Sequence, residues 1–260
     1  MDDLRYIKQE LTKIKNNEDS FLGIDGGKID SKIWICGVEF GSLLKEMEDY
    51  YSNEKTVMHE EKEGFKIPYR INAGQFENSK YDLFLSEFVI NLFNKENIKR
   101  NDYLKNYLYN SNSDIFKLNL YPLAKINTDW DKTIDDIFKI TKEEYYGYIF
   151  NNRKRLFNKL IIKFMPKVII CSITKGTEDI FTNAFFNQNE WLSFKMEIVN
   201  CKIEDRGKSK TFKISVYKKN DLSLIMIPFF GMGNGNLNSH DDVIFMAKYL
   251  KENYLKKILN

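Results

Sequence analysis

The feature that most constrains the fold is a series of short apolar segments separated by longer amphipathic ones. The apolar segments comprise residues 32–37, 115–120, 167–172 and 224–227. Between them, apolar residues recur at helical spacing, as in residues 81–93. Short buried strands that alternate with amphipathic helices are typical of a parallel sheet with helices on both faces. We therefore expect an α/β fold, a three-layer αβα sandwich around a short, mostly parallel central sheet.

Several helix starts carry capping residues. Thr141, followed three residues later by Glu144, forms a capping-box pattern and predicts a helix that ends near Phe164. Ser42 and Ser239 can cap the helices that follow them. The predicted helices cover residues 3–15, 43–51, 81–93, 141–164 and 176–186 and a last segment from residue 240 onward, whereas residues 52–78 are predicted to be a loop.

The chain of 260 residues is long enough for one large α/β domain. It shows no internal repeat and no composition change that would mark a domain boundary. We therefore expect one domain over residues 1–260, with an N-terminal helical addition over 1–30. Residues 191–203 and 211–217 have the pattern of a strand pair, so we expect a basic β-hairpin insertion over 191–219.

Charge and hydropathy limit the classes of partner. The 40 Lys and Arg residues against 37 Asp and Glu give a net charge of +3, too small to indicate a polyanion-binding protein. Nucleic-acid contact must therefore depend on local clusters, and the candidates are Arg153 and Arg155 in one basic run and Lys208 and Lys210 in another. The usual alternative for such runs is a solvated face.

Cysteine and histidine are scarce. The three cysteines have no metal-binding spacing, and there are only two histidines, so we expect no metal ion and no cofactor. No segment approaches the roughly 20 consecutive apolar residues of a membrane span, and the first residues have no signal-peptide pattern. We expect a cytoplasmic, reduced protein without a membrane partner.

Three predicted strands end in unusual polar residues. One strand runs into Gly37-Val38-Glu39-Phe40-Gly41-Ser42, another into Asn119-Leu120-Tyr121, and the last into the glycine-rich loop 230–236. Ligands of such sheets bind beyond the carboxyl ends of the strands. We expect the three ends to form one crevice.

Two residues at these ends are catalytic candidates. Glu39 lies between glycines at a helix start, where a carboxylate can act as a base or orient water, or can simply cap the helix. The amide of Asn119 can both donate to and accept from the edge of a flat polar ring, although an Asx turn before Pro122 explains the residue better when it is taken alone.

The glycine-rich loop offers weaker candidates. The main chain around Gly233, Asn234 and Asn236 can cradle a phosphate, or the loop is an ordinary flexible turn. Ser239 and His240 follow, and His240 is either catalytic or part of the helix start. Phe40 and Tyr121 are candidates for stacking on a base, although most aromatic residues in such a chain belong to the core.

Together, these strand ends resemble the uracil-DNA glycosylase superfamily. Gly37-Val38-Glu39-Phe40-Gly41 is similar to its first motif, Asn119 occupies the place of its base-reading Asn, and Asn234 to Ser239 occupies that of its last motif. Residues 165–172 are similar to a segment common in the middle of these proteins. Phe40 replaces the usual proline, and the last motif lacks His-Pro-Ser because His240 is displaced towards the helix.

The resemblance implies a glycosylase-like αβα sandwich that binds a nucleobase, a nucleotide or DNA. As an enzyme it would hydrolyse an N-glycosidic bond of a modified base, with Glu39 activating water and Asn119 reading the base. The alternative is a non-catalytic DNA- or nucleotide-binding regulatory module on the same fold. A small-nucleotide hydrolase is a third hypothesis.

Overall fold

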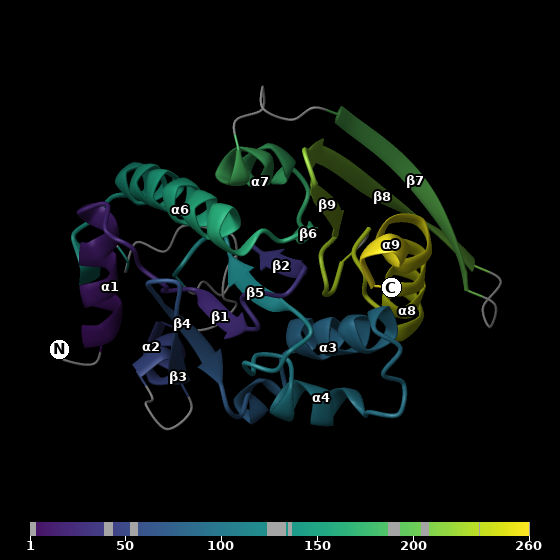
Figure 1. The fold of residues 1–260 in the computed structure, drawn as a ribbon, viewed down its shortest axis with the longest axis horizontal. Coiled ribbons are helices and arrows are strands. Elements are labelled where there is room, and N and C mark those ends of the chain that lie inside the picture. The colour runs from purple at the N-terminus through teal and green to yellow at the C-terminus, as the bar shows by residue number, and fades with distance from the viewer. Residues whose placement is uncertain are drawn as a thin grey trace.

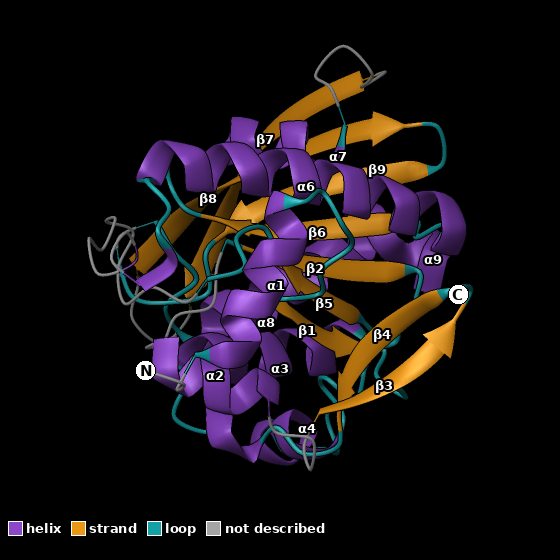
Figure 2. Ribbon diagram, turned by 90° about the vertical axis from the view of Figure 1, so that its left-hand side faces the viewer, coloured by secondary structure: helices purple, strands orange, loops and turns teal. Residues whose placement is uncertain are grey.

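The computed structural model describes most of the chain. The described residues are 4–38, 44–52, 57–123, 134, 137–186, 193–203, 208–233 and 235–259. They form an α/β fold around a seven-stranded sheet, with a separate two-stranded sheet beside it (Figures 1 and 2).

The seven strands follow one another in the order β1-β5-β2-β6-β9-β8-β7. Their bounds are Ile24–Gly27 for β1, Phe116–Asn119 for β5, Ile33–Gly37 for β2, Val168–Ile173 for β6, Leu222–Pro228 for β9, Lys208–Lys219 for β8 and Ser193–Ile203 for β7. The four apolar segments of the sequence form β5, β2, β6 and β9, which lie side by side and parallel.

The sheet as a whole is mixed: its central strands β5, β2, β6 and β9 are parallel, and antiparallel strands extend it at both edges. β1 pairs antiparallel with β5 at one edge, and β8 and β7 continue antiparallel from β9 at the other. The predicted basic hairpin is therefore continuous with the central sheet. The sequence predicts the antiparallel hairpin itself but not its junction with the sheet, because a hairpin pattern alone does not reveal which strand lies beside it. The strand β1 was not predicted.

Helices cover both faces of the sheet (Figure 1). On one face, α3 (Lys80–Leu92) and α8 (His240–Leu250) bury a large apolar cluster against alternate strand residues such as Ile35, Ile170 and Ile225. On the other face, α6 (Lys142–Phe164) and α7 (Glu178–Phe185) bury residues such as Trp34 and Phe116. The alternation of strand side chains between the two clusters explains the continuous apolar runs in the sequence.

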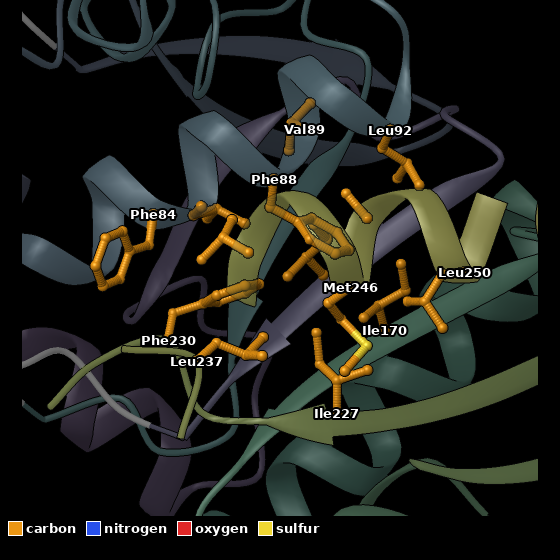
Figure 3. Packing of buried hydrophobic residues seen from close by; sticks show 14 of the residues in the cluster. Phe84, Phe88, Val89, Leu92, Ile170, Ile227, Phe230, Leu237, Met246 and Leu250 are labelled. Atoms are coloured by element: carbon orange, nitrogen blue, oxygen red, sulfur yellow. The ribbon is translucent and has the colours of Figure 1, made fainter. Parts of the chain in front are cut away.

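The first of these clusters is seen from close by in Figure 3. Phe88 and Leu92 on α3 point towards Met246 and Leu250 on α8, while Ile227 of β9 lies beneath them. The helix α4 (Arg100–Asn106), which the sequence did not predict, adds Tyr103 and Leu104 to the same cluster.

The N-terminal helix is tied to the rest of the protein. α1 (Arg5–Lys15) and α2 (Leu44–Ser52) form a third apolar cluster with the start of α6. Glu48 of α2 accepts hydrogen bonds from the main-chain N–H groups of Tyr6 and Ile7, at 2.7 and 2.9 Å. A carboxylate at this end of α1 also opposes the positive end of the helix dipole.

Residues 57–70, predicted to be part of a loop, form a second sheet. Its strands are β3 (Val57–Lys62) and β4 (Phe65–Arg70), and a 3₁₀ turn (Gly74–Phe76) follows. The chain ends with a π-helical turn (Lys251–Leu255) and α9 (Lys256–Leu259). Among the described residues, the structure contains no helix with the length and apolar character needed to cross a bilayer.

Candidate ligand site at the carboxyl edge of the sheet

The ends of β2 and β5 lie next to each other, as the sequence predicts. Gly37 is paired with Asn119 in the parallel ladder. Beyond the ladder, Leu120 N–H donates to the Gly37 carbonyl at 2.9 Å, and Tyr121 N–H donates to the Val38 carbonyl at 2.8 Å. Val38 and Tyr121 therefore lie side by side just beyond the ends of the two strands.

Three polar side chains are buried beneath these ends, and we call Asp25, Lys117 and Asn119 the buried triad. Their exposed fractions are 4%, 1% and 2%. Lys117 Nζ donates to Asp25 Oδ2 at 3.2 Å, to the Leu118 carbonyl at 3.1 Å and to Asn119 Oδ1. Asn119 Nδ2 donates to Asp25 Oδ2 and to the Gly23 carbonyl, each at 3.0 Å. The buried charges are thus paired and hydrogen-bonded to one another.

Local sequence explains how the triad forms. Along β5, Phe116 and Leu118 point into the α6 cluster, so Lys117 and Asn119 point to the opposite face. The register of β1 against β5 shifts between Ile24 and Gly26, where Asp25 lies. A bulge of this kind redirects a side chain.

Gly37 leaves the space that the triad occupies. A Cβ atom at this position would lie 2.6 Å from Asn119 Oδ1, 3.0 Å from Lys117 Nζ and 3.1 Å from the Tyr81 hydroxyl oxygen. Gly37, the last residue of β2, must therefore be a glycine, because any side chain there would clash with Asn119, Lys117 or Tyr81.

Tyr81 of α3 connects the triad to the end of β9. Its ring lies 5.4 Å from Lys117 Nζ, and its centroid lies 5.4 Å from that of Phe229 and 5.7 Å from that of Phe230. Phe230 N–H donates to Ser172 Oγ of β6 at 3.2 Å. Around Tyr81, the three strand ends predicted to converge lie close together.

Burial changes the acidity of two neighbouring groups on α3. Removal from water raises the pKa of Tyr81 well above its usual value, so its phenol is neutral. Burial also raises the pKa of Asp82 to about 6, although hydrogen bonds from Ser79 and Tyr109 favour the ionised form. Tyr109 donates its hydroxyl hydrogen to Asp82 Oδ1. A carboxyl group that titrates near neutral pH therefore lies next to Tyr81.

The glycine-rich loop is closed by its own hydrogen bonds. Asn236 Nδ2 donates to the Met232 carbonyl at 2.7 Å, and Asn238 Nδ2 donates to that of Gly233 at 3.0 Å. Gly233 has φ +119°, a conformation that favours glycine. The main-chain N–H of Asn236, predicted to be part of a phosphate cradle, also donates within the loop, to the Gly233 carbonyl at 3.4 Å.

Ser239 and His240 are adjacent in the sequence but have different surroundings. Ser239 Oγ accepts from Asp242 N–H at 3.3 Å and caps α8, and Asp242 Oδ2 accepts from Ser239 N–H at 3.1 Å. His240 is exposed and lies against Glu87 and against Arg100, whose Nη1 is 3.0 Å from His240 Nδ1. His240 thus contacts Glu87 of α3 and Arg100 of α4.

Tyr121 lies against the other helix layer. Its ring centroid is 5.1 Å from that of Tyr146 and 6.5 Å from that of Tyr145, both on α6. The ring is partly buried, so stacking on a ligand would have to use the face that α6 leaves free. Glu39, Phe40, Gly41, Ser42 and Asn234, which were also predicted to form the site, lie outside the described residues.

The predicted basic contacts are mostly engaged within the protein. Arg153 is fully buried and donates to the main-chain carbonyls of Ser20 and Leu22, so its prediction as a nucleic-acid contact is wrong. Arg153, Lys154 and Arg155 are consecutive in the sequence but point to different sides of α6, and Arg153 is on the buried side. Arg155 Nη1 pairs with Asp19 at 2.7 Å.

The two lysines predicted to contact nucleic acid from the hairpin are in β8. Lys210 Nζ pairs with Asp242 Oδ2 at 2.7 Å and donates to Asn238 at 2.8 Å, which ties β8 to the start of α8. Lys208 is the first residue of β8.

Sequence reasoning missed Asp25, Tyr81, Asp82 and Lys117. The one available signal was Lys117, a lysine between Phe116 and Leu118 inside a strand-like apolar run. A charged residue at that position must be either exposed or paired with an opposite charge. The sequence does not show that the neighbouring strand supplies Asp25 as its partner.

The described residues contain no group of three or more His, Cys, Asp or Glu side chains that could hold a metal ion. No protein-family model matches the chain, and no curated protein matches it significantly.

Proposed function

We propose that the protein binds a nucleobase or nucleotide at the carboxyl edge of β5, β2, β6 and β9 and hydrolyses an N-glycosidic bond there. The observation that carries this proposal is the convergence of three strand ends around Tyr81, above the buried triad. The carboxyl edge is where open sheets with parallel strands bind ligands. The motif resemblance of residues 37–41 supports the choice of ligand.

In this proposal the triad supports the site from below. Because the Asn119 amide is already bonded to Asp25, Lys117 and Gly23, it fixes the ends of β1 and β5 relative to each other. Contacts to the base would then come from main-chain groups that follow Gly37 and from partly buried rings such as Phe229. Flat aromatic rings stack readily on nucleobases.

The proposed reaction consumes water. The carboxylate of Glu39 takes a proton as the water oxygen forms a bond to the anomeric carbon, and it stabilises the positive charge that develops on the sugar. The glycosidic C–N bond breaks, and the base leaves with its electron pair. The base takes a proton from water, and Glu39 returns the proton it accepted to the solvent, so the net reaction consumes one water molecule. A base in duplex DNA would first have to be flipped out of the stack.

A cytoplasmic location is part of the proposal. Cys36, Cys171 and Cys201 are free and buried, which suits a reducing compartment.

A non-catalytic binding module is the second candidate. It is favoured by the internal bonding of the Asn119 amide, which leaves the predicted base-reading group paired within the protein. Such a module would hold the same ligand without releasing a base.

The test measures binding and product in the same samples. Single-stranded DNA, duplex DNA and free nucleotides, each with normal and modified bases, are titrated across a salt series and assayed for abasic sites or released base. We expect the wild-type protein to bind the ligand and release its base. Glu39→Gln should lower the rate of base release by a factor on the order of 10²–10⁴ with little loss of affinity. Glu96→Gln, at an exposed loop position, is the matched control.

The other outcomes decide between the alternatives. Binding without base release would replace the enzyme by the binding module. Release of phosphate instead of base would indicate a nucleotide hydrolase. Absence of binding to any of these ligands at low salt would refute the proposal.

A further inference from the structure

The outer strand of the sheet carries an exposed row of apolar side chains. β7 pairs with β8 and is the last strand of the seven (Figures 1 and 2). Phe194, Met196 and Ile198 alternate along it with exposed fractions of 55%, 52% and 70%, and we call them the apolar row. Residues two apart in a strand share a face, so the three side chains lie together on one face of the sheet.

The apolar row lies beside the helix that covers the neighbouring strand. Opposite Phe194 and Ile198, β8 carries Tyr217 and Lys213, and both bond Glu178 of α7 at 3.0 and 2.8 Å. The row therefore extends the face that α7 covers. A long edge strand with exposed apolar side chains is a template for pairing with another strand.

The two residues that alternate with the members of the apolar row along β7 carry opposite charges. Lys195 and Glu197 flank Met196 and point to the opposite face. Glu197 is ionised, because hydrogen bonds from Lys195 and Tyr254 lower its pKa. On this face, Glu197 also accepts from the Tyr249 hydroxyl at 2.9 Å.

We propose that β7 pairs antiparallel with β7 of a second copy of this chain, about a two-fold axis at Met196. In this register Met196 faces Met196 of the second copy, and Phe194 faces Ile198. Lys195 then faces Glu197 on both sides of the axis. The two apolar rows join on one face. On the other face, the Lys195–Glu197 ion pair of one chain meets that of the second copy with opposite charges facing each other, so the strand is complementary to itself.

The neighbouring registers are disfavoured by the same side chains. If both copies present the row on the same face, the two-fold axis is perpendicular to the sheet and passes between two equivalent residues, so the antiparallel pairing must be centred on a residue. Centring on Lys195 would oppose two lysines, and centring on Glu197 would oppose two glutamates. Like charges directly opposite each other destabilise a strand pair.

Sedimentation analysis of the full chain across protein concentration tests the dimer. We expect the mass of two 30.9-kDa chains for the wild-type protein. Met196→Lys brings two positive charges together at the axis and should raise the dissociation constant more than about tenfold. Ile162→Lys is the matched control, since Ile162 is 77% exposed on α6, and it should remain dimeric.

Charge reversal and cross-linking test the register. Lys195→Glu alone should dissociate the dimer, and adding Glu197→Lys should restore it. The three native cysteines are buried, so a cysteine introduced on β7 is the accessible one. Met196→Cys should form a disulfide between chains on oxidation, whereas Phe194→Cys, whose copies lie about four residues apart along the strand, should not.

A wild-type protein that remains a monomer at all concentrations would overturn the proposal. So would a dimer that Met196→Lys leaves intact, or a disulfide that forms as readily through Phe194→Cys as through Met196→Cys. These outcomes do not depend on any activity, so they leave the proposed function untouched.

Discussion

Lys117 is the residue whose surroundings differ most from those of a typical lysine. Its ammonium group is buried next to Tyr81 and is balanced by Asp25, which is buried as well. A buried pair contributes little net stability when intact, but the loss of one partner leaves an unpaired charge in the core. The triad is therefore a constraint on sequence change more than a source of stability.

Lys117→Met should destabilise the protein by about 3–5 kcal/mol, because Asp25 loses its cationic partner. Adding Asp25→Asn should recover a large part of that loss. Urea unfolding of the two single variants, the double variant and the wild-type protein completes a double-mutant cycle. A loss in the double variant equal to the sum of the two single losses would show that the pair is not coupled.

Asp82 makes stability depend on pH in a defined direction. Burial raises its pKa from 3.8 to about 6 in the folded protein, so the folded state binds the proton more tightly than the unfolded state does. The free energy of unfolding must then fall as the pH rises through this window and level off above it.

Relative to Asp82→Asn, the wild-type protein should lose about 1 kcal/mol of stability between about pH 5 and about pH 7. Urea unfolding at both pH values measures the difference. Asp102→Asn removes an exposed carboxylate from the first turn of α4 and serves as the control. A difference that grows in the opposite direction would contradict the burial of Asp82.

At the scale of elements, the capping box of α6 shows a local signal that the structure confirms. Thr141 Oγ1 accepts from Glu144 N–H at 3.2 Å, and Glu144 accepts from Thr141 N–H at 2.9 Å. The helix starts at Lys142 and ends at Phe164, as the sequence predicts. Such contacts involve residues three positions apart, which is why sequence reveals them.

Thr141→Ala should lower the free energy of unfolding by about 1 kcal/mol, since one main-chain N–H of the first turn loses its partner. Thr141→Ser keeps the oxygen and should retain most of the stability. Thermal or urea unfolding followed by circular dichroism distinguishes the two. Equal losses in both variants would assign the effect to the Thr141 methyl group instead of the cap.

The elements that escaped prediction depend on distant partners. β1 contains Gly26 and Gly27, which propensity assigns to a turn, yet it pairs with β5 from almost one hundred residues away. Likewise, β3 and β4 lie in a segment that contains Gly64 and Pro68. The buried strands were predicted because their apolar runs are continuous, and a polar or glycine-rich strand carries no such signal.

The site follows the same division. The adjacency of Gly37 and Asn119 could be predicted, because it follows from parallel strands ending at one edge. The roles of Asp25 and Tyr81 could not, because a strand bulge and the orientation of α3 bring them there. Arg153 appeared as part of a basic run, although burial and main-chain carbonyls determine its role.

At the scale of the whole molecule, stability should be distributed unevenly. β2 and β6 are paired on both sides and covered on both faces. The β3–β4 pair forms a separate two-stranded sheet. Isolated strand pairs are marginally stable, so this part of the molecule should open more easily than the central strands.

Native-state hydrogen exchange should therefore rank the two sheets. Amides of β2 and β6 should exchange only through global unfolding, while those of β3 and β4 should exchange with a lower free energy of opening. Exchange measured at increasing low denaturant concentration separates local from global opening. Equal opening free energies would show that the small sheet is part of the same cooperative unit.

The position of β9 has a consequence for how the protein is made. This strand, residues 222–228, lies between β6 and β8, both of which precede it in the chain. During synthesis, β6 and the β7–β8 hairpin are complete before the strand that joins them emerges. Until then both present unpaired strand edges, which favour association with other chains. A nascent chain stopped before Leu222 should therefore depend on chaperones more than the finished protein does.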